Sequence, residues 1–196
     1  MELKKFFILF FIYLTCISKS YSIEPDVFVQ STVNRASKIL SEDVSKEKKM
    51  KELQIIARDT VDIVGIGFYT LGSARKNLTA DQKQTYSELF HEYFLKSFSS
   101  RLAEYTNPEI EVLSKEVLNE NYTIVNSLLK GTSDRPEVKI DWRIYTKNPE
   151  QPLIRDLIIE GLSLARTQKE EFSSILNSNN NDINVLFQTL EKFSNQ

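Results

Sequence analysis

Residues 141–176, DWRIYTKNPEQPLIRDLIIEGLSLARTQKEEFSSIL, are the part of the sequence that decides the fold. A strand begins just before them. The apolar residues Ile140, Trp142 and Ile144 alternate with charged or aromatic residues. Such a repeat of two residues is typical of a strand with one buried face. We therefore predict a strand over residues 138–145.

The rest of this stretch predicts a second strand and then a helix. Two prolines interrupt the pairing of the first strand, and residues 153–159 are again apolar and β-branched, as in an antiparallel partner. Gly161 ends that strand. From residue 162 onward, apolar residues recur at helical spacing, with charged residues on the opposite side. The sheet is therefore expected to pass directly into a helix.

The N-terminus has the layout of a secretory signal peptide. Lys4 and Lys5 precede an apolar run of about 12 residues, and small residues follow up to Ser22. The run is shorter than the ~20 residues that span a bilayer, which argues against a transmembrane anchor. We predict a cleaved signal peptide over residues 1–22 and a single domain over residues 23–196.

Cysteine usage and charge exclude several kinds of function. The only cysteine, Cys16, lies within the predicted signal peptide, so the mature chain would have no disulfide and no thiol nucleophile. Lipidation of Cys16 is disfavoured because Tyr13 and Thr15 are not the small residues that such processing needs. The net charge is −2 and becomes more negative once the basic leader is removed, which argues against a nucleic-acid partner.

The N-terminal part of the mature chain is expected to be helical. Residues 24–58 carry partial apolar faces that predict two helices. Residues 59–75 have few charges and three glycines, each of which costs a helix about 1 kcal/mol relative to alanine. This composition predicts a buried segment with close backbone packing or short helices joined by bends.

A long aromatic helix should follow. Thr79 and Gln82 form a capping box at its start. Behind it, apolar residues keep helical spacing for more than five turns: Tyr86, Leu89, Phe90, Tyr93, Phe94, Phe98, Leu102 and Tyr105. Such a face suits either an aromatic core or the wall of a ligand cavity, and the pattern alone leaves both open.

Two more strands and a last helix complete the prediction. Residues 110–117 and 122–129 predict a hairpin, and the turn-forming residues 131–136 lead into the strand of Trp142. Four consecutive antiparallel strands are therefore expected. A polar loop over residues 177–182 separates the helix after Gly161 from a final amphipathic helix.

Residue types that carry chemistry are sparse. His91, the only histidine, lies beside the apolar stripe, and no spacing of ligands suggests a metal. No serine lies in a nucleophile-elbow motif, and the glycines do not form a nucleotide-binding motif. Asp156 and Glu160 share a strand face and could act as an acid–base pair, but ion pairs with Arg143 or Arg155 are the favoured interpretation.

Three stretches together resemble the MlaC family of phospholipid carriers, also known as the toluene-tolerance or ABC-transporter auxiliary component family. The first is Phe68-Tyr69-Thr70-Leu71-Gly72, followed by the capping box and the aromatic helix. The second is residues 138–143, a strand ending in tryptophan and arginine. The third and most specific is the D-x-x-x-E-G-x-S run of residues 156–163, followed by a helix rich in glutamine and aromatic residues. The resemblance covers roughly residues 27–193.

The resemblance implies an α+β fold in which N-terminal helices pack on a highly twisted four-stranded antiparallel sheet, followed by C-terminal helices. It also implies an enclosed apolar pocket for acyl chains. From the faces of the predicted helices and strands, ten residues are expected to line that pocket: Phe68, Tyr69, Leu71, Tyr86, Phe90, Phe94, Trp142, Ile144, Ile158 and Leu162. Arg143, Asp156 and Glu160 are expected to hold the strands and the pocket rim.

The function implied by the resemblance is non-enzymatic and uses no cofactor. It is a periplasmic phospholipid-binding shuttle between outer- and inner-membrane complexes that maintains outer-membrane lipid asymmetry. The implied partners are a phospholipid, an outer-membrane lipoprotein complex, and an inner-membrane ABC transporter with a membrane-anchored substrate-binding subunit. Two alternatives stay open: a carrier of another lipid such as a hopanoid, and a small exported α+β enzyme that uses Asp156 or Glu160.

Overall fold

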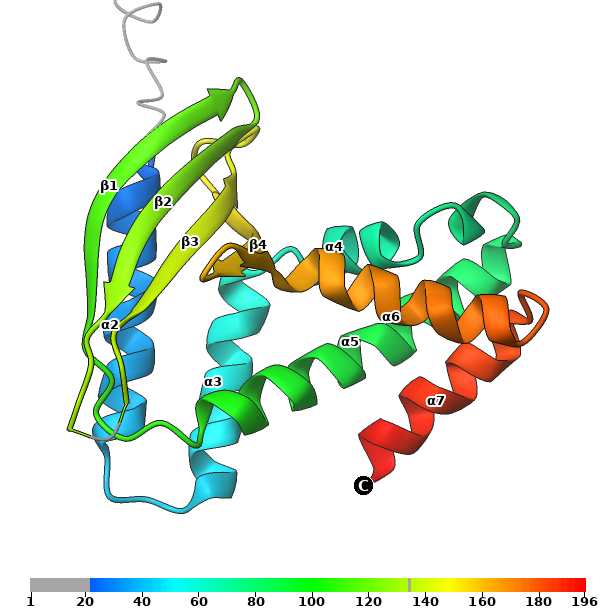
Figure 1. The fold of residues 1–196 in the computed structure, drawn as a ribbon, viewed down its shortest axis with the longest axis horizontal. Helices are drawn as coiled ribbons and strands as arrows, with labels where there is room; N and C mark the ends of the chain where they lie inside the picture. The colour runs from blue at the N-terminus through cyan, green and yellow to red at the C-terminus, as the bar shows by residue number, and fades with distance from the viewer. Residues whose placement is uncertain (1–21, 134) are drawn as a thin grey trace, which may run out of the picture.

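The computed structural model describes residues 22–133 and 135–196 and has an α+β architecture (Figure 1). The predicted signal peptide, residues 1–22, lies almost entirely outside the described residues. The helices of the described chain are α2 Pro25–Ser41, α3 Lys46–Thr60, α4 Ile63–Thr70, the short 3-10 helix η1 Ala74–Lys76, α5 Ala80–Leu102, α6 Leu164–Ser178 and α7 Ile183–Asn195. No helix within the described ranges is both long and apolar enough to cross a bilayer.

The sheet is antiparallel, with its strands in sequence order: β1 Ile110–Asn119, β2 Tyr122–Leu129, β3 Val138–Tyr145, β4 Leu153–Ile159 and β5 Leu162–Ser163. The four predicted strands are all present. The fifth is a two-residue strand that pairs with β4 through a tight turn at Glu160 and Gly161, both at positive φ (49° and 82°). The following helix therefore begins at Leu164, two residues later than the sequence pattern predicts.

A bulge in β4 decides which side chains share the core face of the sheet. Trp142 pairs with Val125 on one side and Leu157 on the other, whereas Ile144 pairs with Ile154. Arg155 is the extra residue between these two pairs, so the alternation of β4 reverses there. Residues opposite one another in an antiparallel pair project from the same face, so Leu157 joins Trp142 on the core face.

Polar side chains set the starts of several helices. Ser45 accepts a hydrogen bond from Lys48 N at the start of α3, and the predicted capping box of Thr79 and Gln82 is present at α5. Asp62 caps α4 by accepting from Gly65 N at 2.8 Å. Since each cap satisfies a backbone amide that has no partner within its helix, these residues fix the point where each helix begins.

The helices pack in two groups around one connected core (Figure 1). Helix α2 covers β1 and β2, while α5 packs against α3, α4 and α7, and α6 packs beside α4 and against β4. The segment around α4 was predicted to be buried, and only its inner face is. Gly67 lies directly against Phe90, where an added Cβ would be 2.8 Å from the ring, whereas Val64 on the outer face is 54% exposed.

Candidate functional site

The aromatic helix α5 contributes fully buried residues as well as half-buried ones. Tyr86 and Phe90 are 0% and 2% exposed. The Tyr86 hydroxyl lies 2.8 Å from Thr70 Oγ1 and donates to the carbonyl oxygen of Gly67 at 3.1 Å. Burial, partly offset by the hydrogen bond with Thr70, raises the pKa of Tyr86 far above its ordinary value. This tyrosine is a neutral anchor between α4 and α5.

Phe90 is the centre of an aromatic cluster that joins three helices. Its ring lies 5.7 Å from Tyr86 and meets Phe172 of α6 edge-on at 6.3 Å. Tyr93, one turn away, contacts Phe193 of α7 at 4.9 Å. These rings contact one another within the core, and the role of Tyr86 and Phe90 as a pocket wall stays a prediction.

Farther along α5 the aromatic residues are less covered. Phe94 and Phe98 are half-buried and stack on each other, with ring centroids 5.7 Å apart and an interplanar angle of 11°. Both pack against the edge of the core without being enclosed by it. Of the predicted helical residues, Phe94 is therefore best placed to contact a bound apolar ligand, and Phe98, absent from the predicted set, is its neighbour.

The predicted sheet residues divide between the two faces of the sheet. Trp142 is 8% exposed, with its indole N–H donating to Ser127 Oγ at 2.8 Å, and Ile144 is fully buried. Ile158 pairs with Asp141, so it lies on the opposite face. Leu162 is 59% exposed. The structure thus brings Trp142 and Ile144 together and leaves Ile158 and Leu162 apart from them.

The register places other apolar residues beside Trp142 on its face. Leu157 pairs with Trp142, and Ile159 pairs with Ile140. Both are half-buried. The sequence pattern missed them because it assumes unbroken alternation along β4, and the bulge at Arg155 carries no clear signal in the sequence.

The three predicted residues from the α4 segment have different surroundings. Leu71 is 2% exposed, and Phe68 is half-buried with its ring 6.5 Å from that of Tyr86. Tyr69 is 41% exposed and lies beneath the ammonium group of Lys169, which is 5.2 Å from its ring centroid. Tyr69 therefore lies at the surface of α4.

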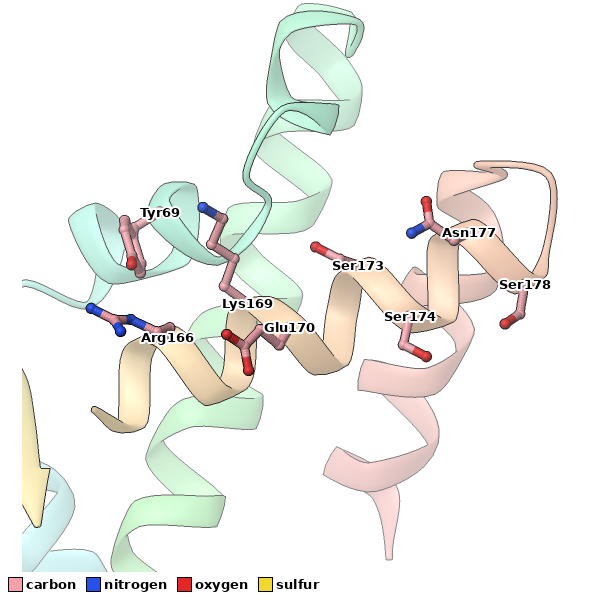
Figure 2. A pocket seen from close by; sticks show the side chains of 8 residues that line it. All are labelled: Tyr69, Arg166, Lys169, Glu170, Ser173, Ser174, Asn177 and Ser178. Atoms are coloured by element: carbon pink, nitrogen blue, oxygen red, sulfur yellow. The ribbon is translucent and has the colours of Figure 1, made fainter. Parts of the chain in front are cut away.

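Two surface hollows are lined mainly by polar side chains. The first, of about 530 Å³, lies between α4 and α6 (Figure 2) and is lined by Tyr69, Arg166, Lys169, Glu170, Ser173, Ser174, Asn177 and Ser178. The second, of about 540 Å³, is lined by Ser100, Arg101, Glu104, Tyr105 and Arg135. Tyr69 is the only predicted pocket residue that borders either hollow, so the apolar lining as a whole stays a prediction.

The charged residues of β4 form structural contacts. Asp156 is 4% exposed, and its carboxylate accepts hydrogen bonds from Ser163 Oγ at 2.6 Å and from Ala165 N at 3.0 Å at the start of α6. Arg143 approaches the same carboxylate only to 3.8 Å, and its buried Nε has no hydrogen-bond partner among the described residues. Asp156 therefore mainly binds the start of α6. Its predicted ion pair with Arg143 is present but longer.

Glu160 and Arg155 pair differently from the prediction. The Glu160 carboxylate accepts a hydrogen bond from Lys139 N across the β3–β4 pair. Arg155 binds Asp62, donates to the Tyr122 hydroxyl at 3.0 Å and lies over the Tyr145 ring at 4.2 Å. Within the described ranges, no three His, Cys, Asp or Glu side chains gather as a metal site would require.

Most of the chain matches one protein-family model. A family model described as MlaC protein matches residues 30–192. The chain belongs to the MlaC family. The family resemblance found in the sequence is therefore confirmed.

Individual relatives agree with this assignment. The chain is 25% identical over 191 residues to the intermembrane phospholipid transport system binding protein MlaC of Haemophilus influenzae, an alignment that covers 90% of this chain and 87% of that protein. A solved phospholipid-binding protein from Ralstonia solanacearum, in complex with a phospholipid, superposes with a TM-score of 0.74 at 18% identity. The superposition covers 89% of this chain and 98% of the Ralstonia solanacearum chain. This structural likeness bears on the fold and confirms the α+β class.

Proposed function

We propose that this protein is a phospholipid-binding shuttle that moves lipid between membrane complexes across the periplasm. The observation that carries the proposal is the match of residues 30–192 to the MlaC family, supported by the likeness to the intermembrane phospholipid transport system binding protein of Haemophilus influenzae. The proposed partners are an outer-membrane lipoprotein complex and an inner-membrane ABC transporter with its membrane-anchored substrate-binding subunit.

The physical need for a carrier follows from the hydrophobic effect. Two acyl chains with roughly thirty methylenes at ~0.8 kcal/mol each give a transfer cost of about 24 kcal/mol into water. A phospholipid therefore does not cross an aqueous space unaided. A protein that covers the chains while leaving the headgroup near solvent removes most of this cost without any chemical step.

The geometry supports a position for the acyl chains between the core face of the sheet and helix α5. Both elements belong to one connected core, yet they make little direct backbone contact within the described chain. Half-buried apolar side chains border that core on both sides, with Leu157 and Val138 on the sheet and Phe94 and Phe98 on α5. Acyl chains can replace contacts among such side chains at low cost, whereas Tyr86 and Phe90 are fixed by packing.

The competing enzyme hypothesis finds less support. Each oxygen of the Asp156 carboxylate already accepts a hydrogen bond at the start of α6, and Glu160 bonds the backbone of β3. A general base must also be within reach of the proton that it abstracts, and Asp156 is only 4% exposed. Carriage of another lipid, such as a hopanoid, uses the same apolar surface and is separated from phospholipid carriage by experiment.

The test is to identify the lipid that copurifies with the protein when it is expressed with its leader. Extraction with organic solvent and mass spectrometry should recover a phospholipid in near-equal molar amount. Recovery of a polycyclic lipid would change the cargo, and recovery of no lipid would contradict the proposal.

The position of the chains can be tested through the only tryptophan of the sequence, Trp142. Loading the protein with a phospholipid that carries bromine atoms on its acyl chains should quench the Trp142 fluorescence. Phe94→Glu should lower both the lipid content and the quenching. Phe187→Glu is the matched control, because Phe187 of α7 is also half-buried against the core. Full quenching in Phe94→Glu would place the chains elsewhere.

A further inference from the structure

The second surface hollow lies where the C-terminal end of α5 meets the turn between β2 and β3. Residues Ser100, Arg101, Glu104 and Tyr105 line it from the first segment and Arg135 lines it from the turn, around about 540 Å³. The Arg135 guanidinium lies over the Tyr105 ring at 5.2 Å, so the two segments are in direct contact. Two guanidinium groups from distant parts of the sequence therefore border one hollow.

Both arginines keep their charge free for a ligand. Arg101 and Arg135 are exposed, and no described residue forms an ion pair with either of them. Glu104 is the only acidic side chain that lines the hollow among the described residues, and the Lys46 ammonium binds its carboxylate at 2.6 Å. The hydrogen bond and charge of Lys46, with a smaller contribution from Arg135, hold the pKa of Glu104 below its ordinary value. The one carboxylate of the hollow is thus paired with a third cation.

Other negative charges close by do not cancel this excess. Of the described acidic residues near these segments, Glu109 faces Lys130 at 3.6 Å, and Glu137 does not line the hollow. The C-terminal end of α5 carries about half a negative charge from the helix dipole. Three cations against one carboxylate and this half charge leave the hollow with a net positive charge of about one and a half.

The hollow adjoins the half-buried apolar side chains proposed to hold the acyl chains. On α5, Phe94, Phe98 and Arg101 follow one another at spacings of four and three residues, so they lie along one side of the helix. The two phenylalanine rings stack at 5.7 Å. On the sheet, Arg135 lies three residues before Val138, which packs half-buried against the core. Both arginines therefore stand at the solvent end of segments that border the proposed acyl site.

We propose that Arg101 and Arg135 bind the phosphate group of a glycerophospholipid whose acyl chains lie between α5 and the sheet. This inference rests on the proposed lipid carriage and adds a position for the headgroup. A guanidinium group is a planar fork that donates two parallel hydrogen bonds to phosphate oxygens. The hollow is open to solvent, so it recognises the phosphate and leaves the variable end of the headgroup in water. A polycyclic lipid without phosphate would gain nothing from these arginines.

The test compares two lipids that differ only in the phosphorylated headgroup. Protein exported with its leader and then stripped of lipid is titrated with dioctanoylphosphatidylglycerol or with dioctanoylglycerol, and calorimetry gives each Kd. Arg101→Gln/Arg135→Gln should weaken binding of dioctanoylphosphatidylglycerol about tenfold, because two exposed ion pairs are lost. Binding of dioctanoylglycerol should stay within about twofold. Arg101→Lys/Arg135→Lys keeps the charges but loses the forks, and should show a smaller loss.

Arg58→Gln/Arg75→Gln is the matched control, because it removes the same charge from two exposed arginines. Arg58 lies twelve residues beyond Lys46 on α3, about 18 Å along the helix. Arg75 precedes the start of α5, whose 23 residues span about 34 Å before the hollow. This variant should bind both lipids within about twofold of wild type, with circular dichroism confirming the fold of every variant.

Inorganic phosphate separates a lipid headgroup from a free anion as the occupant. Phosphate should raise the apparent Kd of wild-type protein for dioctanoylphosphatidylglycerol but not for dioctanoylglycerol. If phosphate binds equally well to protein already loaded with dioctanoylphosphatidylglycerol, the hollow is a free-anion site and the headgroup assignment is overturned.

The remaining outcomes separate this inference from the proposed carriage. Wild-type affinity of Arg101→Gln/Arg135→Gln for dioctanoylphosphatidylglycerol, an equal loss for both lipids, or an equal loss in the control would overturn the headgroup site alone. Wild-type protein that binds neither lipid would overturn the carriage and the headgroup site with it.

Discussion

Replacing Asp156 by alanine should destabilise the fold strongly, although the residue takes part in only one loose ion pair. Its buried carboxylate accepts hydrogen bonds from Ser163 Oγ at 2.6 Å and Ala165 N at 3.0 Å, at the positive end of α6. Hydrogen bonds to a charged group contribute about 1.5–3 kcal/mol each, and their loss leaves buried donors unsatisfied. Two such bonds together contribute about 3–6 kcal/mol, and removing one partner of a buried charged contact costs about 3–5 kcal/mol, so we predict a cost of about 3–5 kcal/mol.

The contribution of Arg143 should be much smaller. Its guanidinium is 3.8 Å from Asp156 Oδ2, and its side chain is 37% exposed, so water screens the pair. Arg143→Met should therefore cost about 1 kcal/mol or less. Asp156→Asn, which keeps one acceptor but loses the charge, should cost about 1–2 kcal/mol.

Thermal and urea unfolding followed by circular dichroism measure these differences. For a chain of this length 1 kcal/mol corresponds to about 2–4 °C, so Asp156→Ala should lower Tm by roughly 6–20 °C. Glu160→Gln, which keeps an acceptor for Lys139 N at an exposed turn, is the control and should stay within about 0.5 kcal/mol. If Arg143→Met costs as much as Asp156→Ala, the ion pair and not the cap is the main contact, and the reasoning is refuted.

Three further changes test contacts between elements. Gly67→Ala should cost about 1–3 kcal/mol in thermal unfolding, because its Cβ would lie 2.8 Å from the packed Phe90 ring; a neutral or stabilising effect would contradict this. Burial raises the pKa of the Tyr86 hydroxyl, so this group ionises at a lower pH in the unfolded chain than in the folded one. The free energy of unfolding should therefore fall as the pH rises above about 10. Tyr86→Phe should make that decline less steep, as measured by urea unfolding at increasing pH. Arg155→Met should cost about 1–3 kcal/mol by leaving Asp62, the cap of α4, without its cation, and wild-type unfolding would show that the contact is dispensable.

Local signals in the sequence were sufficient for most elements of the fold. The capping box of Thr79 and Gln82 involves residues within one turn, so the start of α5 could be predicted from sequence alone. The alternation around Trp142 likewise predicted β3, because one face of that strand is buried and the other is wetter. Such patterns depend on neighbours in the chain and need no knowledge of the tertiary structure.

Predictions that depended on register across the sheet were less successful. The bulge at Arg155 places Leu157 beside Trp142 and turns Ile158 to the other face, and nothing in the residue types shows where an extra residue enters. Leu162 was expected in a helix that faces the pocket, but it lies in a two-residue strand, too short to show a period. These positions are decided by pairing with distant residues.

The aromatic helix shows why the lining of the proposed pocket is harder to predict than the fold. Tyr86, Phe90 and Phe94 lie on one helical stripe, and their sequence spacing cannot separate a side chain packed by Phe172 from one that is half-buried at the edge of the core. The difference comes from α6, whose N-cap Ser163 is hydrogen-bonded to Asp156 of β4. The contact with Phe172 of α6 therefore distinguishes the buried Phe90 from the half-buried Phe94, and the sequence spacing along α5 carries no sign of that contact.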